Sequence, residues 1–276
     1  MAVHLRHLPR VVDVAAVTEV EHDAPVPADV VRVAFLAHWS ETERQSRSTL
    51  RLIAELQRLG YRVIVSSTST APGRLDFAAE DVRLDELTVL RRPNAGYDFG
   101  SWAVAMAAHD ELLSRPYVLL LNDSLVGPFA PLDAVIEDFE QTSADVWGMV
   151  ESNQFASHLQ SFFRGFRYGV LAEPVMRHFW RDLRVIPDKA ALIAEYEFGF
   201  SDFLLQNGFS TAPFVHHSDV VGEGLNPTIH GWRALFDVGV PFVKRELVRQ
   251  PDLTADGHRI PAVIADRYGT DVADWL

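Results

Sequence analysis

Apolar residues in the first half of the chain occur either in short continuous runs or at helical spacing. The run VVRVAFLAHW (residues 30–39) is rich in β-branched residues and is typical of a strand buried on both faces. Ser40 and Glu43 fit a capping box, and apolar residues at helical spacing continue to Gly60, which predicts a helix. Further strands are predicted at RVIVSS (62–67), LTVLRR (87–92) and YVLLL (117–121), with a helix over 101–114. This β-α-β-β-α-β order predicts a mostly parallel sheet with crossover helices.

The second half continues the same pattern without an internal repeat or a linker. A helix is predicted after Pro131, then strands at DVWGMV and SHLQSFFRGF, then helices at EPVMRHFWRDL and over 188–207. We therefore expect an N-terminal arm over residues 1–28 and a single domain over residues 29–276. The expected fold class is α/β, with a Rossmann-like, mostly parallel central sheet and helices on both faces.

Composition narrows the possible classes of function. Of 276 residues, 25 are Lys or Arg and 38 are Asp or Glu, so the formal net charge is −13. No dense basic run is present, which argues against nucleic acid as a partner. The chain has no cysteine, which excludes disulfides, thiolate nucleophiles and cysteine-ligated zinc.

Membrane and export signals are also missing from the sequence pattern. Asp13 interrupts the only apolar run near the start, which does not fit a cleaved signal peptide. No run of eighteen apolar residues occurs, so no membrane span is expected. We expect a cytoplasmic protein, and peripheral association with the inner membrane face stays open.

Four polar loops follow predicted strands, where open α/β sheets bind their ligands, and the last of them follows the strand near Phe214 to His217. The first contains Ala37, His38 and Trp39; the second is RRPNAGYDFGS, and the third is Asn122-Asp123-Ser124. Backbone N–H groups of the second loop suit a diphosphate or a sugar hydroxyl. The alternatives are an ordinary turn with solvated arginines in the second loop and an Asx turn in the third.

Several of these segments resemble a known family. RRPNAGYDFGSW, a helix and RPYVLLLNDSLVGPF are similar to the core of A-type glycosyltransferases, in which an Asn-x-Gly turn and a helix precede a strand that ends in a D-x-D-like motif. More narrowly, the chain resembles the rhamnan synthesis protein F family through six segments in order: NAGYDFGSW, LLNDSLVGP, DVWGM, SHLQSFF, YEFGFS and VPFVKREL.

The resemblance implies a hexosyltransferase of polysaccharide biosynthesis, specifically an inverting rhamnosyltransferase. Its donor would be a dTDP- or UDP-linked deoxysugar, and its acceptor a hydroxyl of a glycan, a lipid-linked glycan or a small molecule. The predicted donor-binding residues are Ala37, His38, Trp39, Arg92, Asn94, Gly96, Asp98, Asn122, Asp123, Ser124 and Lys244.

One departure from the family motif concerns metal. The usual motif ends in an acid that coordinates a divalent ion, and here that position is Ser124, so Asp123 is the one charged ligand of the motif. Two alternatives follow. Either Mg²⁺ or Mn²⁺ binds through Asp123, or the protein does not depend on metal and Arg91, Arg92 or the Lys244-Arg245 pair carries the phosphate charge.

The resemblance also implies a catalytic carboxylate before a Gly-aromatic pair. Glu197 precedes Gly208 by the family's spacing of eleven residues, so we expect Glu197 to be the general base, with Asp202 as the second candidate. The aromatic neighbours of Glu197 suggest a raised pKa. Trp147, His158 and Gln160 are expected to bind the acceptor, because aromatic faces beside planar polar groups suit sugars.

Two other functions compete with this interpretation. The first is a sugar-nucleotide or glycan-binding protein without catalytic activity, motivated by Ser124. The second, a dinucleotide enzyme, lacks its G-x-G-x-x-G signature, because AHWSETER follows the first strand.

Overall fold

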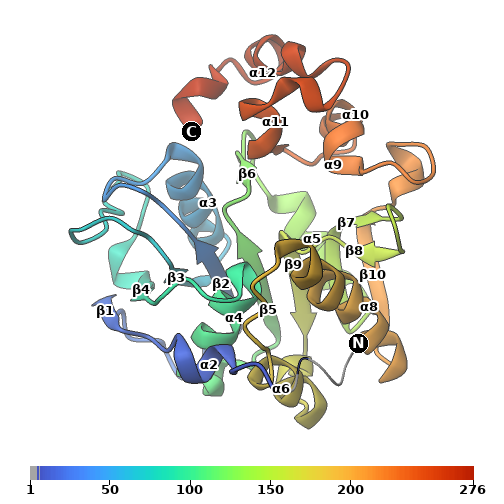
Figure 1. The fold of residues 1–276 in the computed structure, drawn as a ribbon. Helices are drawn as coiled ribbons and strands as arrows, with labels where there is room; N and C mark the ends of the chain where they lie inside the picture. The colour runs from blue at the N-terminus through green and yellow to red at the C-terminus, as the bar shows by residue number, and fades with distance from the viewer. Residues whose placement is uncertain (1–4, 6) are drawn as a thin grey trace.

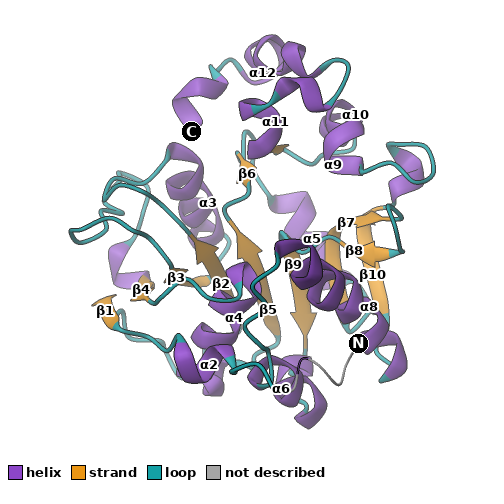
Figure 2. Ribbon diagram, viewed as in Figure 1, coloured by secondary structure: helices purple, strands orange, loops and turns teal. Residues whose placement is uncertain are grey.

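The computed structural model describes residue 5 and residues 7–276, and it has a mixed α/β architecture built around one large sheet (Figures 1 and 2). The α/β class predicted from the sequence is confirmed. The strands are β1 Glu19–His22, β2 Arg32–His38, β3 Arg62–Ser67, β4 Leu87–Arg91, β5 Tyr117–Asn122, β6 Leu125–Val126, β7 Val146–Ser152, β8 His158–Leu159, β9 Phe163–Arg167, β10 Thr211–Val215 and β11 Val243–Lys244.

Helices connect most of these strands. The α-helices are α2 Val11–Val14, α3 Arg47–Arg58, α4 Tyr97–Ala108, α5 Asp133–Gln141, α6 Pro174–Arg181, α7 Lys189–Leu192, α8 Gly199–Gln206, α9 Pro227–His230, α10 Trp232–Asp237, α11 Arg245–Arg249 and α12 Ile260–Tyr268. A π-helical segment, Ile193–Phe198, joins α7 to α8. The 3₁₀ turns are Leu84–Glu86, Asp110–Leu112, Val170–Ala172, His217–Asp219, Pro251–Leu253, Gly257–Arg259 and Val272–Trp275.

The strand order places many strand ends at one edge. The order is β1-β4-β3-β2-β5-β9-β7-β10, with β8 paired to β7. Strands β2, β3, β4 and β5 are parallel; β9 is antiparallel to both β5 and β7, and β10 is parallel to β7. The carboxyl ends of β2 to β5, β7 and β10 therefore meet at one edge, together with the first residues of β9.

Two apolar layers cover the faces of the sheet. Alternate residues of β2 face opposite layers: Ala34 and Leu36 pack with α3 and α5, whereas Val33 and Phe35 pack with α2, α4 and α6. The period of two along a strand produces this division. The prediction of helices on both faces is thus confirmed.

A third apolar cluster lies above the carboxyl edge. It joins Val126 of β6 to residues of α10, α11 and α12, and β6 pairs antiparallel with β11. Figure 1 shows helices α9 to α12 gathered beyond the ends of the central strands. The C-terminal segment therefore forms a wall beside the edge where a ligand is expected.

The described part of the expected N-terminal arm packs onto the sheet. Val11 and Ala15 are buried in the layer that contains α4, and β1 adds antiparallel to β4.

Two predicted helix starts are wrong. Helix α3 begins at Arg47, where the Ser46 side chain accepts a hydrogen bond from the Thr49 backbone. Ser40 and Glu43 instead bond within loops, so the capping box predicted there does not form. Helix α4 begins at Tyr97, four residues before the predicted start at Ser101.

Candidate functional site

The ends of β2 and β5 are joined through Asp123. Its Oδ2 atom accepts a hydrogen bond of 2.9 Å from the backbone N–H of Trp39. Arg245 donates from Nε to the Asp123 carbonyl oxygen at 3.1 Å, and its own backbone N–H donates to the Ser124 carbonyl. Three segments distant in sequence are therefore fixed around one carboxylate.

A cleft of about 1360 Å³ opens beside this carboxylate. It lies between the loop after β2 with the start of α3 on one side, and residues 268–276 on the other. Its lining includes the predicted residues His38, Trp39, Asp123 and Ser124, and also Arg245 and Arg249, which follow the predicted Lys244. A cavity of this size accommodates a ligand as large as a nucleotide sugar.

The Asn122-Asp123-Ser124 loop combines a turn with an available carboxylate. Asn122 Oδ1 accepts hydrogen bonds from the Ser124 backbone N–H (3.1 Å) and hydroxyl (2.6 Å), which is an Asx turn. The Asn122 amide also donates to Asp98 Oδ2 at 2.7 Å. Asn122 therefore shapes the loop and ties it to α4, whereas Asp123 and Ser124 face the cleft.

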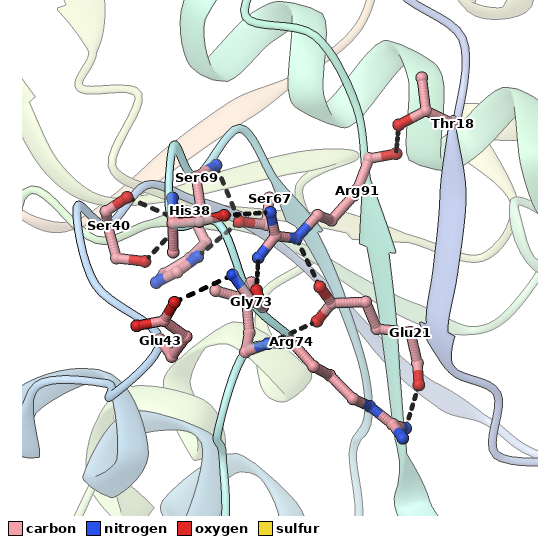
Figure 3. Close-up of polar contacts among 12 residues, drawn as sticks. Thr18, Glu21, His38, Ser40, Glu43, Ser67, Ser69, Gly73, Arg74 and Arg91 are labelled. Atoms are coloured by element: carbon pink, nitrogen blue, oxygen red, sulfur yellow. Dashed lines mark hydrogen bonds and ion pairs between the residues drawn. The ribbon is translucent and has the colours of Figure 1, made fainter.

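The loops after β2 and β3 form one hydrogen-bonded unit, next to Arg91 at the end of β4 (Figure 3). His38 Nδ1 lies 3.0 Å from Ser67 Oγ, and Ser69 joins this unit through Ser67 Oγ and the Ser40 carbonyl. Burial lowers the pKa of His38, and the nearby Asp123 and Gln45 only partly oppose that shift. His38 is therefore held neutral at the floor of the cleft.

Figure 3 also shows what Arg91 does. Its Nε lies 2.5 Å from Glu21 Oε1, and its other nitrogens donate to carbonyls of Ala71 and Gly73. Arg91 thus holds β1 and the 71–73 loop in place, so its guanidinium is already occupied by the protein.

The second predicted loop is packed against the N-terminal arm. Gly96 has φ +77° and is buried, and a Cβ there would lie 2.8 Å from the Val11 side chain, so glycine is required. Arg92 is also buried and donates to Ala15 O, Ser101 Oγ and Ala95 O. The prediction that Arg92 binds the donor is therefore corrected: its guanidinium is occupied by packing contacts.

Of the other predicted donor-binding residues, some are buried and some lie at the surface. Asn94 is exposed in the loop before α4, and Asp98 in the first turn of α4 bonds Asn122. Ala37 is buried in β2, paired with Asn122. The described residues that line the cleft do not include Asn94, Gly96 or Asp98.

Lys244 and Arg245 face different surroundings. Lys244 lines a cavity of about 10 Å³ among apolar residues, whereas Arg245 lines the large cleft. Of the predicted Lys244-Arg245 pair, Arg245 is thus the residue that lines the cleft beside Asp123.

Divalent ions such as Mg²⁺ and Mn²⁺ require several oxygen ligands, and few are gathered near Asp123. No group of three or more His, Asp or Glu side chains suited to a metal ion occurs in the described part of the chain. The oxygens available nearby are one carboxylate and the Ser124 hydroxyl, since Asn122 Oδ1 already accepts two hydrogen bonds. Asp123 would be the charged residue that holds a divalent ion at this place.

Glu197 lies in the π-helical segment, next to the start of β9. Its Oε1 accepts hydrogen bonds from the Ser161 hydroxyl (2.8 Å) and backbone N–H (3.1 Å). Because Asn122 N–H donates to the Phe162 carbonyl at 3.2 Å, Glu197 and Asp123 are held at adjacent strand ends. π-Helical turns are frequent at functional sites.

The charge state of Glu197 differs from the expectation. Burial raises its pKa, but the Arg164 guanidinium, the Ser161 hydrogen bonds and His158 together hold the pKa below its ordinary value. The predicted raised pKa is therefore wrong, because a buried cation lies close by. Glu197 is ionised at neutral pH and can accept a proton.

Asp202, the second candidate base, is exposed on α8. Its carboxylate makes no hydrogen bond or ion pair with the described part of the protein.

The three predicted acceptor residues are all buried. Trp147 lies in the core, with its ring 5.6 Å from Phe139 and its Nε1 donating to Asp138 Oδ2 at 2.7 Å, so the prediction that it forms an acceptor wall is corrected. Gln160 donates to Asn226 Oδ1 at 3.2 Å, and its Oε1 has no hydrogen-bond partner among the described residues. Burial lowers the pKa of His158, and its Nδ1 lies 2.8 Å from the Ala156 carbonyl.

Sequence reasoning missed two charged groups: Arg164, which acts on Glu197, and Glu151 near the end of β7. Arg164 of β9 is only 1% exposed, and its guanidinium lies 5.1 Å from the Phe200 ring. Its Nε and one terminal nitrogen make no hydrogen bond with the part of the chain that the structure describes. Glu151 of β7 meets His216 and His217, with Oε2 3.0 Å and 3.4 Å from their Nδ1 atoms. The available signal for Arg164 was an arginine between Phe163 and Gly165 in the interior of β9.

Fold and site together define an α/β protein with a ligand cleft at the carboxyl ends of its central strands. A model of the rhamnan synthesis protein F family matches residues 67–267. The chain belongs to that family, as its sequence motifs predict.

The chain is also similar to two curated proteins. Virulence protein VirA of Vibrio anguillarum is 30% identical over 194 residues, which cover 58% of this chain and 62% of VirA. The uncharacterized protein y4gN of Sinorhizobium fredii is 23% identical over 154 residues, covering 54% of this chain and 40% of y4gN. The chain thus matches less than two thirds of the length of either relative. Within the described residues, no helix is long and apolar enough to cross a membrane.

Proposed function

We propose that the protein is an inverting glycosyltransferase of A-type architecture. It transfers a deoxysugar, rhamnose, from a dTDP donor to a hydroxyl of a glycan. The observation that carries the proposal is the cleft beside Asp123 at the carboxyl ends of β2 and β5, in a chain of the rhamnan synthesis protein F family. Ligands of open α/β sheets bind at this place.

The donor diphosphate would lie between Asp123 and the arginines of α11. Arg245 and Arg249 both line the cleft, and guanidinium groups bind phosphate through charge-assisted hydrogen bonds. A Mg²⁺ or Mn²⁺ ion, where it takes part, would bind Asp123 and the two phosphates and would neutralise charge on the leaving diphosphate. Trp39, 41% exposed at the cleft, offers a ring for the base or the sugar.

Glu197 would act as the general base. Ser161 orients its carboxylate, and the ionised form can take the proton from the acceptor hydroxyl as that oxygen attacks the anomeric carbon. Attack from the face opposite the diphosphate inverts the configuration at that carbon. The sugar would therefore bridge the adjacent ends of β5 and β9.

The experiment combines binding and transfer. Calorimetry with dTDP, UDP, dTDP-rhamnose and UDP-glucose, with and without Mn²⁺, identifies the donor. Incubation of the bound donor with rhamnose oligosaccharides, followed by mass spectrometry and NMR of the new anomeric centre, identifies the reaction. Transfer with inversion supports the proposal. Tight donor binding without transfer to any acceptor would make this a binding protein, and no binding at millimolar nucleotide would overturn the donor site.

A further inference from the structure

Phe155 is a large apolar side chain held in water. It is 85% exposed, at the tip of the 153–157 loop between β7 and β8. Its φ is +68°, in the left-handed region that bulky residues rarely adopt. A strained, exposed aromatic residue needs a compensating role, because both features oppose folding.

Hydrogen bonds on both sides hold this loop in position. Before Phe155, the Asn153 side chain accepts from Gly224 N–H at 3.0 Å, and Gln154 Oε1 accepts from the Asn226 amide at 3.0 Å. After it, the Ser157 hydroxyl donates to Glu151 Oε1 at 3.1 Å. The ring of Phe155 is therefore presented by a fixed loop.

The loop places Phe155 next to the residue that follows Glu197. The ring centroids of Phe155 and Phe198 are 6.2 Å apart, and the His158 ring meets Phe198 edge-on at 4.7 Å. His158 is therefore packed against the residue that directly follows Glu197. An exposed aromatic surface thus borders the proposed base.

We propose that Phe155 and Phe198 form the acceptor platform, on which a saccharide ring packs with its hydroxyl directed to Glu197. This deepens the proposed function and depends on it for the role of Glu197. Sugar rings carry a face of C–H groups and a rim of hydroxyls, and a deoxysugar adds a methyl group. Such a ligand fits an aromatic surface flanked by amides and an imidazole.

The chain offers a matched control. Tyr168 is also an exposed aromatic residue (68%) with a left-handed backbone (φ +43°). It directly follows antiparallel β9, so it lies at the opposite edge of the sheet from Glu197. Truncating Tyr168 reproduces the loss of an exposed ring without touching the proposed platform.

The test measures binding of a rhamnose trisaccharide by calorimetry and saturation-transfer NMR, with and without dTDP. We expect Phe155→Ala to raise the Kd about five- to tenfold. Phe155→Trp should restore binding, Tyr168→Ala should leave it unchanged, and none of the three should alter dTDP affinity.

Several results would overturn the platform. These are unchanged binding in Phe155→Ala, equal losses in Phe155→Ala and Tyr168→Ala, no saccharide binding by the unmodified protein in either condition, or Phe155-dependent binding to phosphatidylglycerol vesicles in place of the saccharide. Saccharide binding that depends on Phe155, in a protein that transfers no sugar, would support the platform and refute the transferase.

Discussion

The backbone N–H of Trp39 donates to Asp123 Oδ2 at 2.9 Å, so the end of β2 fixes the orientation of the carboxylate at the end of β5. One oxygen of Asp123 therefore has a structural partner before any ligand arrives. The two roles of this side chain, bracing the loop and meeting the donor, can be separated by choosing the substitution.

Asp123→Asn retains an acceptor oxygen for Trp39 but loses the charge. We expect the free energy of unfolding to change little, whereas dTDP binding measured by calorimetry in the presence of Mn²⁺ weakens about tenfold or more. Asp123→Ala removes the acceptor as well and should also lower the free energy of unfolding by about 1 kcal/mol in urea titrations. Equal dTDP affinity in all three proteins would exclude Asp123 from the donor site.

Glu197→Gln tests the proposed base. Glutamine keeps the volume and an oxygen that can accept from Ser161, but it cannot take up a proton. We expect normal folding, unchanged dTDP-rhamnose binding and a loss of about two to four decades in transfer rate. Single-turnover transfer and a thermal melt measure the two effects separately.

Asp202→Asn is the matched control, because Asp202 is a carboxylate five positions along the same helical stretch and is exposed. It should retain the transfer rate. Loss of transfer in Asp202→Asn, with transfer retained in Glu197→Gln, would show that Asp202 is the base. Full transfer rates in both variants would place the base at another residue.

Much of the fold could be read from the sequence because the central strands are continuous apolar runs. The β2 run was identified almost to the residue, since burial on both faces leaves few polar positions inside it. The start of α3 was missed because Ser46 and Ser40 are equally good caps in sequence. Contacts of Ser40 with Ser69 in another loop decide between them, and such contacts are invisible along the chain.

Some features of the candidate site could likewise be predicted from the sequence, and others could not. The placement of Asp123 and Trp39 at one edge could be predicted, because strand ends in parallel sheets converge there. The role of Arg92 could not, since the N-terminal arm that occupies its guanidinium is distant in sequence. The pKa of Glu197 could not either, because Arg164 lies on a different element and its charge reverses the effect of burial.

Arg164 should set the pH range over which Glu197 works. The pKa of Glu197 lies below its ordinary value, so the carboxylate stays ionised, and activity falls only as pH drops through that lowered value. In Arg164→Gln the cation is gone and the acid limb of the pH–rate profile should move to higher pH. Arg164→Lys, which keeps the charge, should restore part of the shift, whereas an unmoved limb in Arg164→Gln would contradict this coupling.

His38 should make the protein less stable in acid. Burial lowers its pKa, so the unfolded chain binds a proton that the folded protein excludes. The neutral His38 side chain therefore leaves the free energy of unfolding undiminished above the ordinary histidine pKa. Below that pH the free energy of unfolding falls, by at most about 1.4 kcal/mol per pH unit. Urea unfolding of His38→Gln between pH 7.5 and 5.5 should show a shallower decline, and the exposed His178→Gln should match the unmodified protein.

Arg245 and its neighbour Lys244 provide the sharpest test of where the diphosphate binds. Arg245 lines the large cleft and donates to the Asp123 carbonyl, whereas Lys244 lines a small apolar cavity. Because a guanidinium can make charge-assisted hydrogen bonds to phosphate, Arg245→Gln should raise the Kd for dTDP about tenfold or more, measured by calorimetry. Lys244→Gln removes the same formal charge one residue away and should leave that Kd unchanged. Equal losses would mean that only the overall positive charge matters, and a loss confined to Lys244→Gln would place the diphosphate on the other side of the β11–α11 junction, away from Asp123.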